Sequence, residues 1–522
     1  MKTEKLKQNV KGYVHQFEDG GLRLLRKGQK GVIHAIFSRF GLVLILLLLQ
    51  VGLLFSIFRW FGNLWPHYFG GSVVVTSAMV IYLLNSKMDN SAKITWMVVV
   101  AIAPVVGIPM FFYVKSNFGH NILRKRLLEL EDQLRGWLPQ SQKAVEQLKA
   151  LEPGAASLAK YLYGRGGGFP VYQNTAMTYF PGGEAKFEEL LRQLETAEEY
   201  IFVEYFIIDE GLMWGKILEV LARKALQGVD VRVMYDGTCE FSTLPRNYPR
   251  LLEKLNIQCK VFSPVQPFVS THYNYRDHRK ILVIDGRVGF TGGVNLADEY
   301  INHIQKHGRW KDAAVMLEGE AVRSLTAQFL QMWGILKEPE YEQFLTRPIP
   351  VPENAKGVAA PYGDCPLDGE RVGEMVYIDL LNRARDYIHI MTPYLILDGE
   401  LETALKFAAE RGVDVHLILP GKPDKQFPYA LAKSHYSALL DSGVKISEWS
   451  PGFVHAKVFV VDGREAVVGT INLDYRSLYH HFEDAVWMVD APCIRDIEQD
   501  FQHTLEPVSY THLTLPTNRE VE

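Results

Sequence analysis

A short pattern of chemically active residues occurs twice in this chain of 522 residues. The first copy reads HRKILVID over residues 278–285, and the second reads HAKVFVVD over residues 455–462. Each copy runs on into a glycine-containing turn that ends in asparagine, GGVN at 292–295 and GTIN at 469–472. The histidine, lysine, aspartate, glycine and asparagine recur at identical spacing, which indicates one functional unit used twice.

The histidine and lysine of each copy suit chemistry on a phosphodiester. Side chains two positions apart on a strand point to the same face, which places His278 beside Lys280 and His455 beside Lys457. A lysine ammonium can neutralise the phosphodiester anion, and an imidazole can attack phosphorus or transfer a proton near neutral pH. A single pair of this kind would indicate no more than two polar residues on an exposed strand. Two matched pairs favour one site to which each copy contributes a histidine.

The segments around both copies alternate helices and strands in the same order. We expect helices at 187–197, 214–227, 371–385 and 401–411, and strands at 200–208, 228–235, 387–395 and 412–419. GVDVRVMYDG at 228–237 returns as GVDVHLILPG at 412–421, and WKDAAVM at 310–316 returns as FEDAVWM at 482–488. This alternation predicts an α/β fold with two similar sheet domains in one chain.

Apolar segments precede the predicted sheet domains. Residues 40–58 form an almost uninterrupted apolar run, which at about 1.5 Å per residue can span a hydrocarbon core of about 30 Å. Residues 68–84 and 94–114 are further candidates. We therefore expect N-terminal transmembrane helices and a multi-pass membrane protein with two or three spans. Basic residues flank these segments in conflicting positions, so the side of the membrane that carries the site stays open.

These features divide the chain into six expected parts. They are a basic N-terminal segment at 1–39, a transmembrane region at 40–115, an amphipathic linker helix at 116–165, a first sheet domain at 166–345, a second at 346–506 and an atypical tail at 507–522. The linker carries leucines at helical spacing and is expected to break at Pro139.

Composition argues against two other kinds of site. The net charge is −4, which does not indicate a strongly basic nucleic-acid binder. The four cysteines lie far apart and form no CxxC pair, so neither a zinc site nor a disulfide framework is indicated. The adjacent His480 and His481 resemble a metal pair, but neighbouring residues point apart, and we expect solvated histidines there. We expect no metal ion and no cofactor.

The two HxKxxxxD stretches resemble the phospholipase D superfamily, and the match is closer to the bacterial cardiolipin synthases. The residues that carry the resemblance are NYRDHRKI at 274–281, GFTGGVN at 289–295 with DEY at 298–300, GRWKD at 308–312 and NLDYRS at 472–477. The resemblance runs from about residue 82 to residue 505, and hydrophobic helices ahead of the catalytic part also fit it. The extra N-terminal apolar run and the tail depart from that pattern.

The resemblance implies transfer of a phosphatidyl group between two phosphatidylglycerol molecules at a bacterial cell membrane, giving cardiolipin and glycerol. One histidine would form a phosphohistidine intermediate while the other serves as acid and base. We favour His278 as nucleophile and His455 as acid and base, although the sequence leaves this choice open. The expected partners are phosphatidylglycerol and other anionic phospholipids, and not nucleic acid.

The residues at matched spacing, with two nearby acidic residues, are assigned to three sets. The catalytic set is His278, Lys280, Asp285, His455, Lys457 and Asp462; the substrate-binding set is Asn295, Asn472, Gly292 and Gly469; and the orienting set is Asp312 and Glu483. Within the first set, Asp285 and Asp462 end their strands, so we expect them to hold local geometry more than to do chemistry. Asp312 and Glu483 would orient the histidines, and their alternative interpretation is a surface acid in a turn.

Other functions remain open from the sequence alone. A membrane-bound phospholipase D would deliver the phosphatidyl group to water, and another phosphatidyltransferase would use a different acceptor. A phosphodiester nuclease of the same superfamily is disfavoured by the low basic content. A membrane scaffold without catalysis is disfavoured by the intact histidine and lysine pairs. Acyl-chain preference and oligomeric state are not indicated.

Overall fold

The chain divides into two compact units, and each is described by itself. The computed structural model describes residues 15–16, 22–23, 65–86, 88, 90–115, 118–263, 275–335 and 337–510. The larger unit contains residues 122–268 and 272–522 with 1–25, and the smaller contains 26–121 with 269–271. The first expected span, 40–58, lies outside the described residues.

The smaller unit contains three helices among the described residues, α4 (Trp65–Leu84), α5 (Asn90–Ile102) and α6 (Pro104–Lys115). The second expected span lies within α4. The expectation of one helix over 94–114 is wrong, because the chain breaks at Ala103 and a new helix begins at Pro104. Proline lacks a backbone N–H and disfavours a helical residue before it, but it suits the first turn of a new helix, while Pro109 lies inside α6. Among the residues that the structure describes, no helix combines the length and the apolar character needed to cross a membrane.

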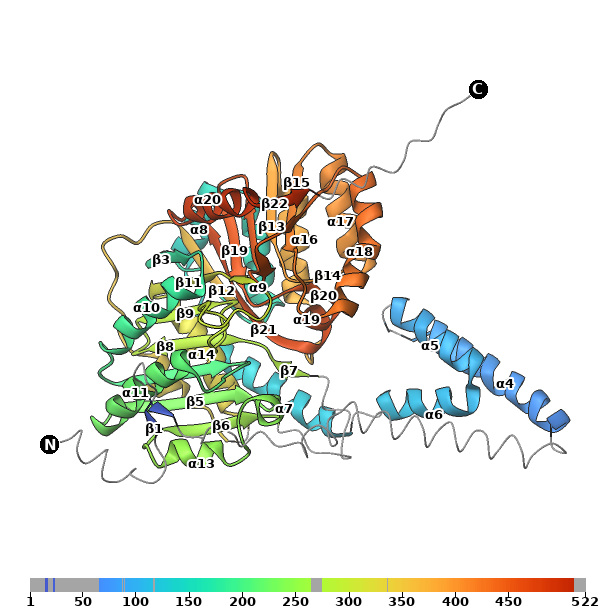
Figure 1. The fold of residues 1–522 in the computed structure, drawn as a ribbon, viewed down its shortest axis with the longest axis horizontal. Helices are drawn as coiled ribbons and strands as arrows, with labels where there is room; N and C mark the ends of the chain where they lie inside the picture. Colours follow the sequence, from blue (N-terminus) through green and yellow to red (C-terminus); the bar gives the residue numbers. More distant parts are fainter. Residues whose placement is uncertain are drawn as a thin grey trace. The chain divides into compact units, whose positions relative to one another are not determined.

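The larger unit is built on two sheets with the same strand order. The first sheet runs β3 (Thr175–Phe180), β11 (Ala314–Gly319), β9 (Val288–Gly292), β8 (Lys280–Ile284), β4 (Tyr200–Tyr205), β5 (Asp230–Asp236), β6 (Gln258–Phe262). The second runs β12 (Val358–Asp364), β21 (His481–Val489), β19 (Glu465–Gly469), β18 (Val458–Val461), β13 (Tyr387–Met391), β15 (Asp414–Pro420), β16 (Lys445–Trp449), β22 (Val508–Tyr510). Both sheets lie side by side in Figure 1, coloured green to yellow and orange to red. The α/β prediction with two similar sheet domains is confirmed.

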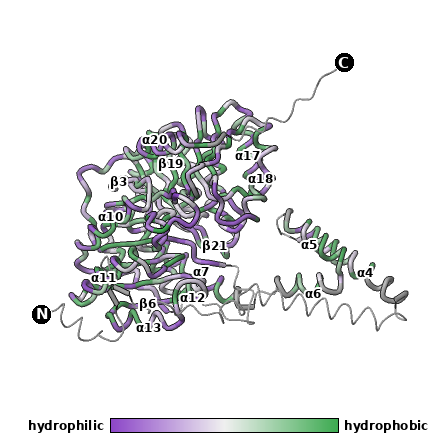
Figure 2. Tube along the Cα trace, in the orientation of Figure 1, coloured by the Kyte–Doolittle hydropathy of each residue, from purple (hydrophilic) through white to green (hydrophobic). Residues whose placement is uncertain are grey.

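The central strands are apolar along most of their length because helices cover both of their faces. All residues of β8 and of β18 are buried, as expected for strands in the middle of a layered α/β fold. Figure 2 shows this as hydrophobic colour along central strands such as β19. The strands next to the HxK residues are therefore rigid supports rather than exposed edges.

Helices on the outer faces complete a separate core for each sheet. The first sheet is covered by α10 (Gly183–Leu194) and α11 (Leu212–Leu226), and the second by α16 (Val372–Arg383), α17 (Gly399–Glu410) and α18 (Gln426–Asp441). Short helices extend these layers: α12 (Cys239–Ser242), α13 (Tyr248–Glu253) and α19 (Tyr475–His480). Another short helix, α15 (Tyr341–Leu345), packs in the core that the two sheets share.

A shared core joins the two sheets. It contains α14 (Val322–Trp333) and α20 (Ile494–Leu505), together with apolar residues of both sheets. Phe202 of the first sheet stacks on Phe329 of α14, with ring centroids 4.4 Å apart, and Met488 of the second sheet lies in the same core. This continuous packing explains why both expected sheet domains belong to one compact unit.

The linker and the tail both pack against this unit. The expected break at Pro139 lies between α7 (Phe118–Arg135) and α8 (Gln142–Leu151), and α9 (Ala155–Gly164) follows. Leu134 and Leu138 join the shared core. The start of the atypical tail forms β22, which pairs antiparallel with β16, while residues 511–522 lie outside the described part.

Candidate active site

Each HxK histidine is held by the half of the chain to which it does not belong. His278 follows β7 (Arg276–Asp277), which pairs parallel with the start of β21. His455 follows β17 (Gly452–Val454), which pairs parallel with β10 (Arg309–Lys311). The amide of His278 donates to the carbonyl of Phe482 at 2.9 Å, and the amide of His455 donates to the carbonyl of Lys311 at 2.6 Å. The backbone itself therefore crosses between the halves at the site.

The side chains repeat this crossing. Nδ1 of His278 lies 2.8 Å from a carboxylate oxygen of Glu483, and Nδ1 of His455 lies 2.7 Å from a carboxylate oxygen of Asp312. Both carboxylates are fully buried. Because a carboxylate accepts at Nδ1, that nitrogen carries the proton and Nε2 keeps a free lone pair. The structure thus gives Asp312 and Glu483 the geometry of orienting residues and excludes the surface-acid interpretation.

The pKa values indicate the protonation state of each histidine–carboxylate pair. Burial lowers the pKa of His455 to about 4 and takes the pKa of His278 well below its usual value, so both rings are neutral near pH 7. Burial acts to raise the pKa of Asp312, but the interaction with His455 outweighs it and holds the pKa at about 2. His278 likewise holds the pKa of Glu483 below its usual range. Both carboxylates are therefore ionised hydrogen-bond acceptors.

Two buried lysines place positive charge in the same site. Lys280 Nζ donates to the carbonyl oxygen of His278, and Lys457 Nζ donates to that of His455. Burial lowers the pKa of Lys280 to about 8 and that of Lys457 to about 7. The charge of Lys280 also acts on His455 and on Lys457, which belong to the other half. The two HxK copies therefore share one electrostatic environment, as their spacing predicted.

The asparagines of the two glycine turns have different surroundings. Asn295 accepts from the Ile207 amide at 3.1 Å and donates to the Tyr300 hydroxyl at 2.8 Å. The buried side-chain oxygen of Asn472 has no hydrogen-bond partner in the described part of the chain. Asn295 is thus occupied in bracing the turn, although its amide retains one N–H.

The structure gives the two glycines a packing role. A Cβ at Gly292 would lie 2.5 Å from Ala314 Cα, and its φ of +135° is unfavourable for other residues. A Cβ at Gly469 would lie 2.3 Å from Ala485 Cβ. Close approach of β11 and β21 therefore accounts for glycine at both positions, and their contact with substrate stays a prediction.

The two aspartates that end the HxKxxxxD pattern hold backbone at the far end of β8 and β18 from the histidines. The Asp285 carboxylate accepts from the amides of residues 198–200 at 2.8–2.9 Å. The Asp462 carboxylate accepts from the amides of residues 385–387 over the same distances. This geometry supports the local structural role that their place at the strand end indicated, and their grouping with the catalytic residues stays a prediction.

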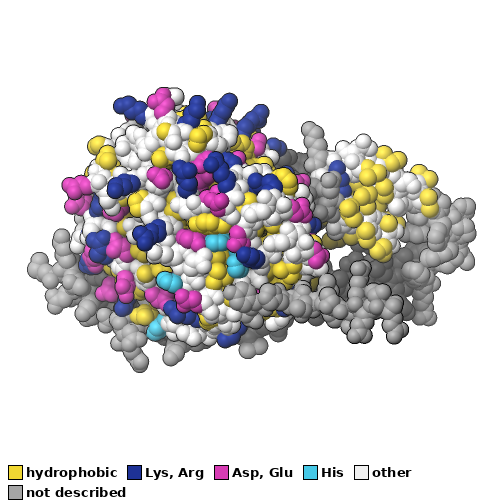
Figure 3. Space-filling view, turned by 90° about the horizontal axis from the view of Figure 1, so that it is seen from above, with side chains coloured by type: hydrophobic (Ala, Val, Ile, Leu, Met, Phe, Trp, Pro, Cys, Tyr) yellow, Lys and Arg dark blue, Asp and Glu magenta, His cyan; other side chains and the backbone are white. Residues whose placement is uncertain are grey.

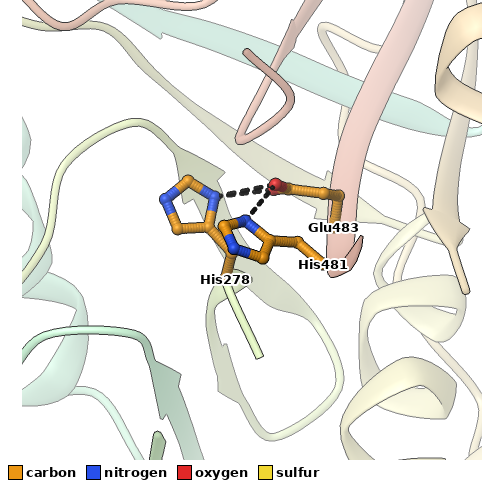
Figure 4. A group of neighbouring side chains, drawn as sticks. All are labelled: His278, His481 and Glu483. Atoms are coloured by element: carbon orange, nitrogen blue, oxygen red, sulfur yellow. Dashed lines mark hydrogen bonds and ion pairs between the residues drawn. The ribbon is translucent and has the colours of Figure 1, made fainter. Parts of the chain in front are cut away.

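His481 is a member of the site that the sequence did not reveal. It is buried, not solvated as expected, and its Nδ1 lies 3.2 Å from Glu483. Its ring centroid lies 5.0 Å from that of His278, and Figure 4 shows both rings turned toward the same carboxylate. Thr470 and Ser477 hydroxyls also donate to Glu483, at 2.5 and 2.7 Å. Only the tertiary fold, through β21, brings these donors together.

The corresponding position in the other half is a tryptophan. Trp310 Nε1 donates to Asp312 at 3.2 Å, and its ring centroid lies 5.2 Å from that of His455. The sheet registers, Ala314 with Gly292 and Ala485 with Gly469, make Asp312 the counterpart of Glu483 and Trp310 the counterpart of His481. The repeat visible in the sequence, which aligns Asp312 with Asp484, is one residue out of register.

Lys186 is a second functional candidate that the sequence did not single out. It lies on the apolar face of α10, fully buried, and donates to the Tyr205 hydroxyl at 3.2 Å and to the Val294 carbonyl at 3.3 Å. Burial lowers its pKa to about 7, and Asp312 and Lys280 also act on it. A lysine among helical apolar positions is the signal that could have found it.

This arrangement can carry out nucleophilic displacement at a phosphodiester. Each ring offers a free Nε2, and buried ammonium groups lie beside both rings, where charge builds up on phosphate oxygens in the transition state. Three residues of the described site, His278, His481 and Glu483, are of types that bind metal ions, and their ligand atoms lie close together.

Comparison with known proteins agrees with this chemistry. A family model described as "Cardiolipin synthase, PLD-like domain" matches residues 190–333 and 377–505. A cardiolipin synthase of Geobacillus kaustophilus is 35% identical over 441 residues, covering 82% of this chain and 86% of that protein. Cardiolipin synthase 2 of Bacillus anthracis is also 35% identical, covering 83% of this chain and 84% of that protein.

Two further matches concern a close relative and the fold. An uncharacterized protein of Streptococcus mutans is 56% identical over 428 residues, covering 82% of this chain and 92% of that protein. The crystal structure of a phosphatidylserine synthase of Haemophilus influenzae has a TM-score of 0.50 at 14% identity, covering 64% of this chain and 87% of that one. The last match is a likeness of fold.

Removal of either orienting carboxylate should slow turnover. We expect Asp312→Asn and Glu483→Gln to lower kcat by about 10² to 10⁴-fold, with the upper end set by the loss in a serine protease whose orienting carboxylate becomes an amide. The physical reason is that Nδ1 loses the acceptor that fixes the ring and its tautomer. Steady-state kinetics with a soluble phosphodiester measure this, with the exposed Glu410→Gln of α17 as control. Wild-type kcat in both carboxylate variants would exclude the orienting role.

The rate should fall as the pH rises from about 6 to about 9. Lys457 and Lys280 have pKa values of about 7 and about 8, so each is charged below its pKa and loses the charge that attracts phosphate above it. We expect kcat/KM to decline through this window. Lys457→Arg, which keeps its charge, should retain more of its own neutral-pH kcat/KM at pH 9. A profile that stays level to pH 10 would contradict the assignment.

Asp285→Ala should affect stability rather than catalysis. Its carboxylate accepts three backbone hydrogen bonds, so we expect the free energy of unfolding to fall by about 2–4 kcal/mol. Activity per folded molecule should stay within a few-fold of wild type. Denaturant titration and active-site-normalised kinetics separate the two effects. A stable but inactive variant would return this residue to the catalytic group.

Proposed function

Because the chain belongs to the cardiolipin synthase family of phospholipase D-like proteins and is a phosphatidyltransferase, we propose that it joins two phosphatidylglycerol molecules. The products are cardiolipin and glycerol. The observation that carries this proposal is the crossed pairing of two neutral histidines with two ionised carboxylates, beside two buried lysines. Such a site can hold one phosphodiester and exchange its alcohol.

The first step splits the donor lipid. Nε2 of His278 attacks the phosphorus of phosphatidylglycerol, and the bond from phosphorus to the headgroup glycerol oxygen breaks. The departing oxygen takes a proton from His455, and the phosphatidyl group remains on His278, whose Nδ1–H stays on Glu483. His455 gains its proton for this step because the phosphate anion favours the cationic imidazole beside it.

The second step reverses these roles. His455 takes the proton from a headgroup hydroxyl of a second phosphatidylglycerol, and that oxygen attacks phosphorus. The phosphorus–nitrogen bond breaks, which releases cardiolipin and restores neutral His278. Asp312 stabilises the positive charge that His455 carries before the first step and again after the second. The proton that leaves the acceptor matches the proton that glycerol carried away.

Buried positive charge supports both displacements. Lys280 and Lys457 lie two residues after their histidines in the chain and have most of their surface removed from water. A charge in such a site is worth more to a developing phosphate anion than the same charge in solvent. We assign them, with Asn472, to the non-bridging phosphate oxygens.

The proposal places this chemistry at a bacterial cell membrane. The substrate is a lipid, and residues 40–58 have the length and composition of a membrane span. The smaller unit also exposes apolar side chains such as Val74, Ile94 and Ile102, and Figure 3 shows hydrophobic side chains gathered there. Apolar surface of this extent favours contact with lipid or with another protein.

An assay of the purified full-length chain tests the reaction. We expect phosphatidylglycerol in detergent micelles to yield cardiolipin and glycerol in equal amounts, without added metal and in the presence of EDTA. Phosphatidic acid as the main product would favour the hydrolase instead, and cleavage of DNA alone would favour a nuclease. His278→Ala should abolish turnover, and rapid quenching should trap phosphatidyl-labelled His278 in His455→Ala.

Mass spectrometry of the trapped species separates the two histidines. A label on His455 in the His278→Ala protein, with none on His278, would reverse the assigned roles. Lack of cardiolipin under every condition would reject the proposed reaction while leaving the family assignment intact.

A further inference from the structure

One cluster in the site includes a histidine, His481, to which the proposed transfer reaction assigns no role. His278, His481 and Glu483 place two imidazole nitrogens and a carboxylate within 4.8 Å of one another. We propose that this cluster is an inhibitory site for a divalent transition-metal ion of the zinc type. The inhibition rests on the proposed transfer reaction, whereas binding of the ion does not.

The spacing of the donor atoms suits tetrahedral coordination. Glu483 oxygens lie 2.8 and 3.0 Å from His278 Nδ1, and one lies 3.2 Å from His481 Nδ1. Zinc bonds of about 2.0–2.1 Å to nitrogen and oxygen put neighbouring ligands about 3.3 Å apart. Small side-chain adjustments therefore bring all three donors onto one ion, with a fourth position left for water.

The surroundings of Glu483 would hold it as a ligand. Thr470 and Ser477 donate hydroxyl hydrogen bonds to its oxygens at 2.5 and 2.7 Å. These bonds remain when an ion replaces the histidine contacts, and hydrogen bonds of this kind orient ligating carboxylates in metal sites. Figure 4 shows the two rings approaching the carboxylate with Nδ1 foremost, so no ring flip is needed.

The other half of the active site provides a natural contrast. There Trp310 takes the place of His481, and its Nε1 is a hydrogen-bond donor to Asp312 without a lone pair for a metal. His455 and Asp312 alone supply two ligands. We therefore expect the ion to bind beside His278 and not beside His455. The difference comes from one position, which is His481 in one half and Trp310 in the other.

Coordination would stop the reaction by moving a proton. His278 uses its Nδ1 for the ion, so the proton of the neutral ring moves to Nε2. An Nε2 that carries hydrogen has no lone pair for attack on phosphorus. No proton is gained or lost by the ring, and removal of the ion restores the reactive tautomer. The inhibition is therefore reversible by a chelator.

The test uses the full-length chain in detergent, with cobalt as a spectroscopic probe and zinc as the inhibitor. We expect Co²⁺ to give the strong visible absorption of tetrahedral coordination, with one ion per chain, and Zn²⁺ to displace it. Zn²⁺ should inhibit phosphatidyl transfer, and EDTA should restore the rate. In His481→Trp, which copies the other half, the zinc concentration for half-inhibition should rise by about 100-fold or more, because a ligand is lost.

Two further variants guard against indirect effects. His481→Asn removes the imidazole without added bulk and should behave like His481→Trp, with inhibition expressed relative to its own metal-free rate. His480→Asn changes the neighbouring histidine, whose ring lies 5.9 Å from that of Tyr275 and outside the ligand set, and should leave zinc inhibition unchanged.

The outcomes distinguish the two proposals. A cobalt spectrum that disappears in both His481 variants supports the metal site even if the chain makes no cardiolipin. Absence of tetrahedral cobalt in the wild-type chain, or equal zinc inhibition in wild type and both His481 variants, would overturn it.

Discussion

Burial of two ionised carboxylates is the constraint on which the rest of this structure depends. Asp312 and Glu483 are fully removed from solvent, a state that costs several kcal/mol per charge unless close partners compensate. Each finds its main partner in a histidine from the opposite half. The halves must therefore meet accurately, and the strand pairs β7 with β21 and β10 with β17 provide that alignment. The shared apolar core with α14 and α20 holds it in place.

The same constraint explains the electrostatics of the site. Lysines that lose water without gaining full carboxylate pairing lose proton affinity, as Lys457 and Lys186 do. Histidines in the same surroundings remain neutral, with the proton on the nitrogen that faces the carboxylate. A bound phosphodiester anion favours the protonated, positively charged forms of these lysines and histidines. The site is therefore better matched to an anionic headgroup with a transferable phosphoryl centre than to a neutral ligand.

Much of the fold and of the candidate site could be predicted from the sequence because the same pattern of residues occurs in both halves. The HxK pattern, the α/β alternation and the break near Pro139 follow from local periodicity and from proline geometry. The break before Pro104 carried the same signal, but the apolar composition outweighed it in the prediction. His481 was missed because its burial depends on a strand from the far half. In the sequence, Asp312 can be aligned with either Glu483 or Asp484. Only the pairing of the strands shows that Glu483 is its counterpart.

The covalent connection between the halves has a consequence for how the two histidines can differ. Two identical, separate halves would give both rings the same carboxylate and the same aromatic neighbour. In one continuous chain, glutamate with His481 can serve one ring while aspartate with Trp310 serves the other. Because both halves belong to one chain, a substitution near one histidine can change its properties without changing the surroundings of the other. The two histidines can therefore take different roles in the reaction.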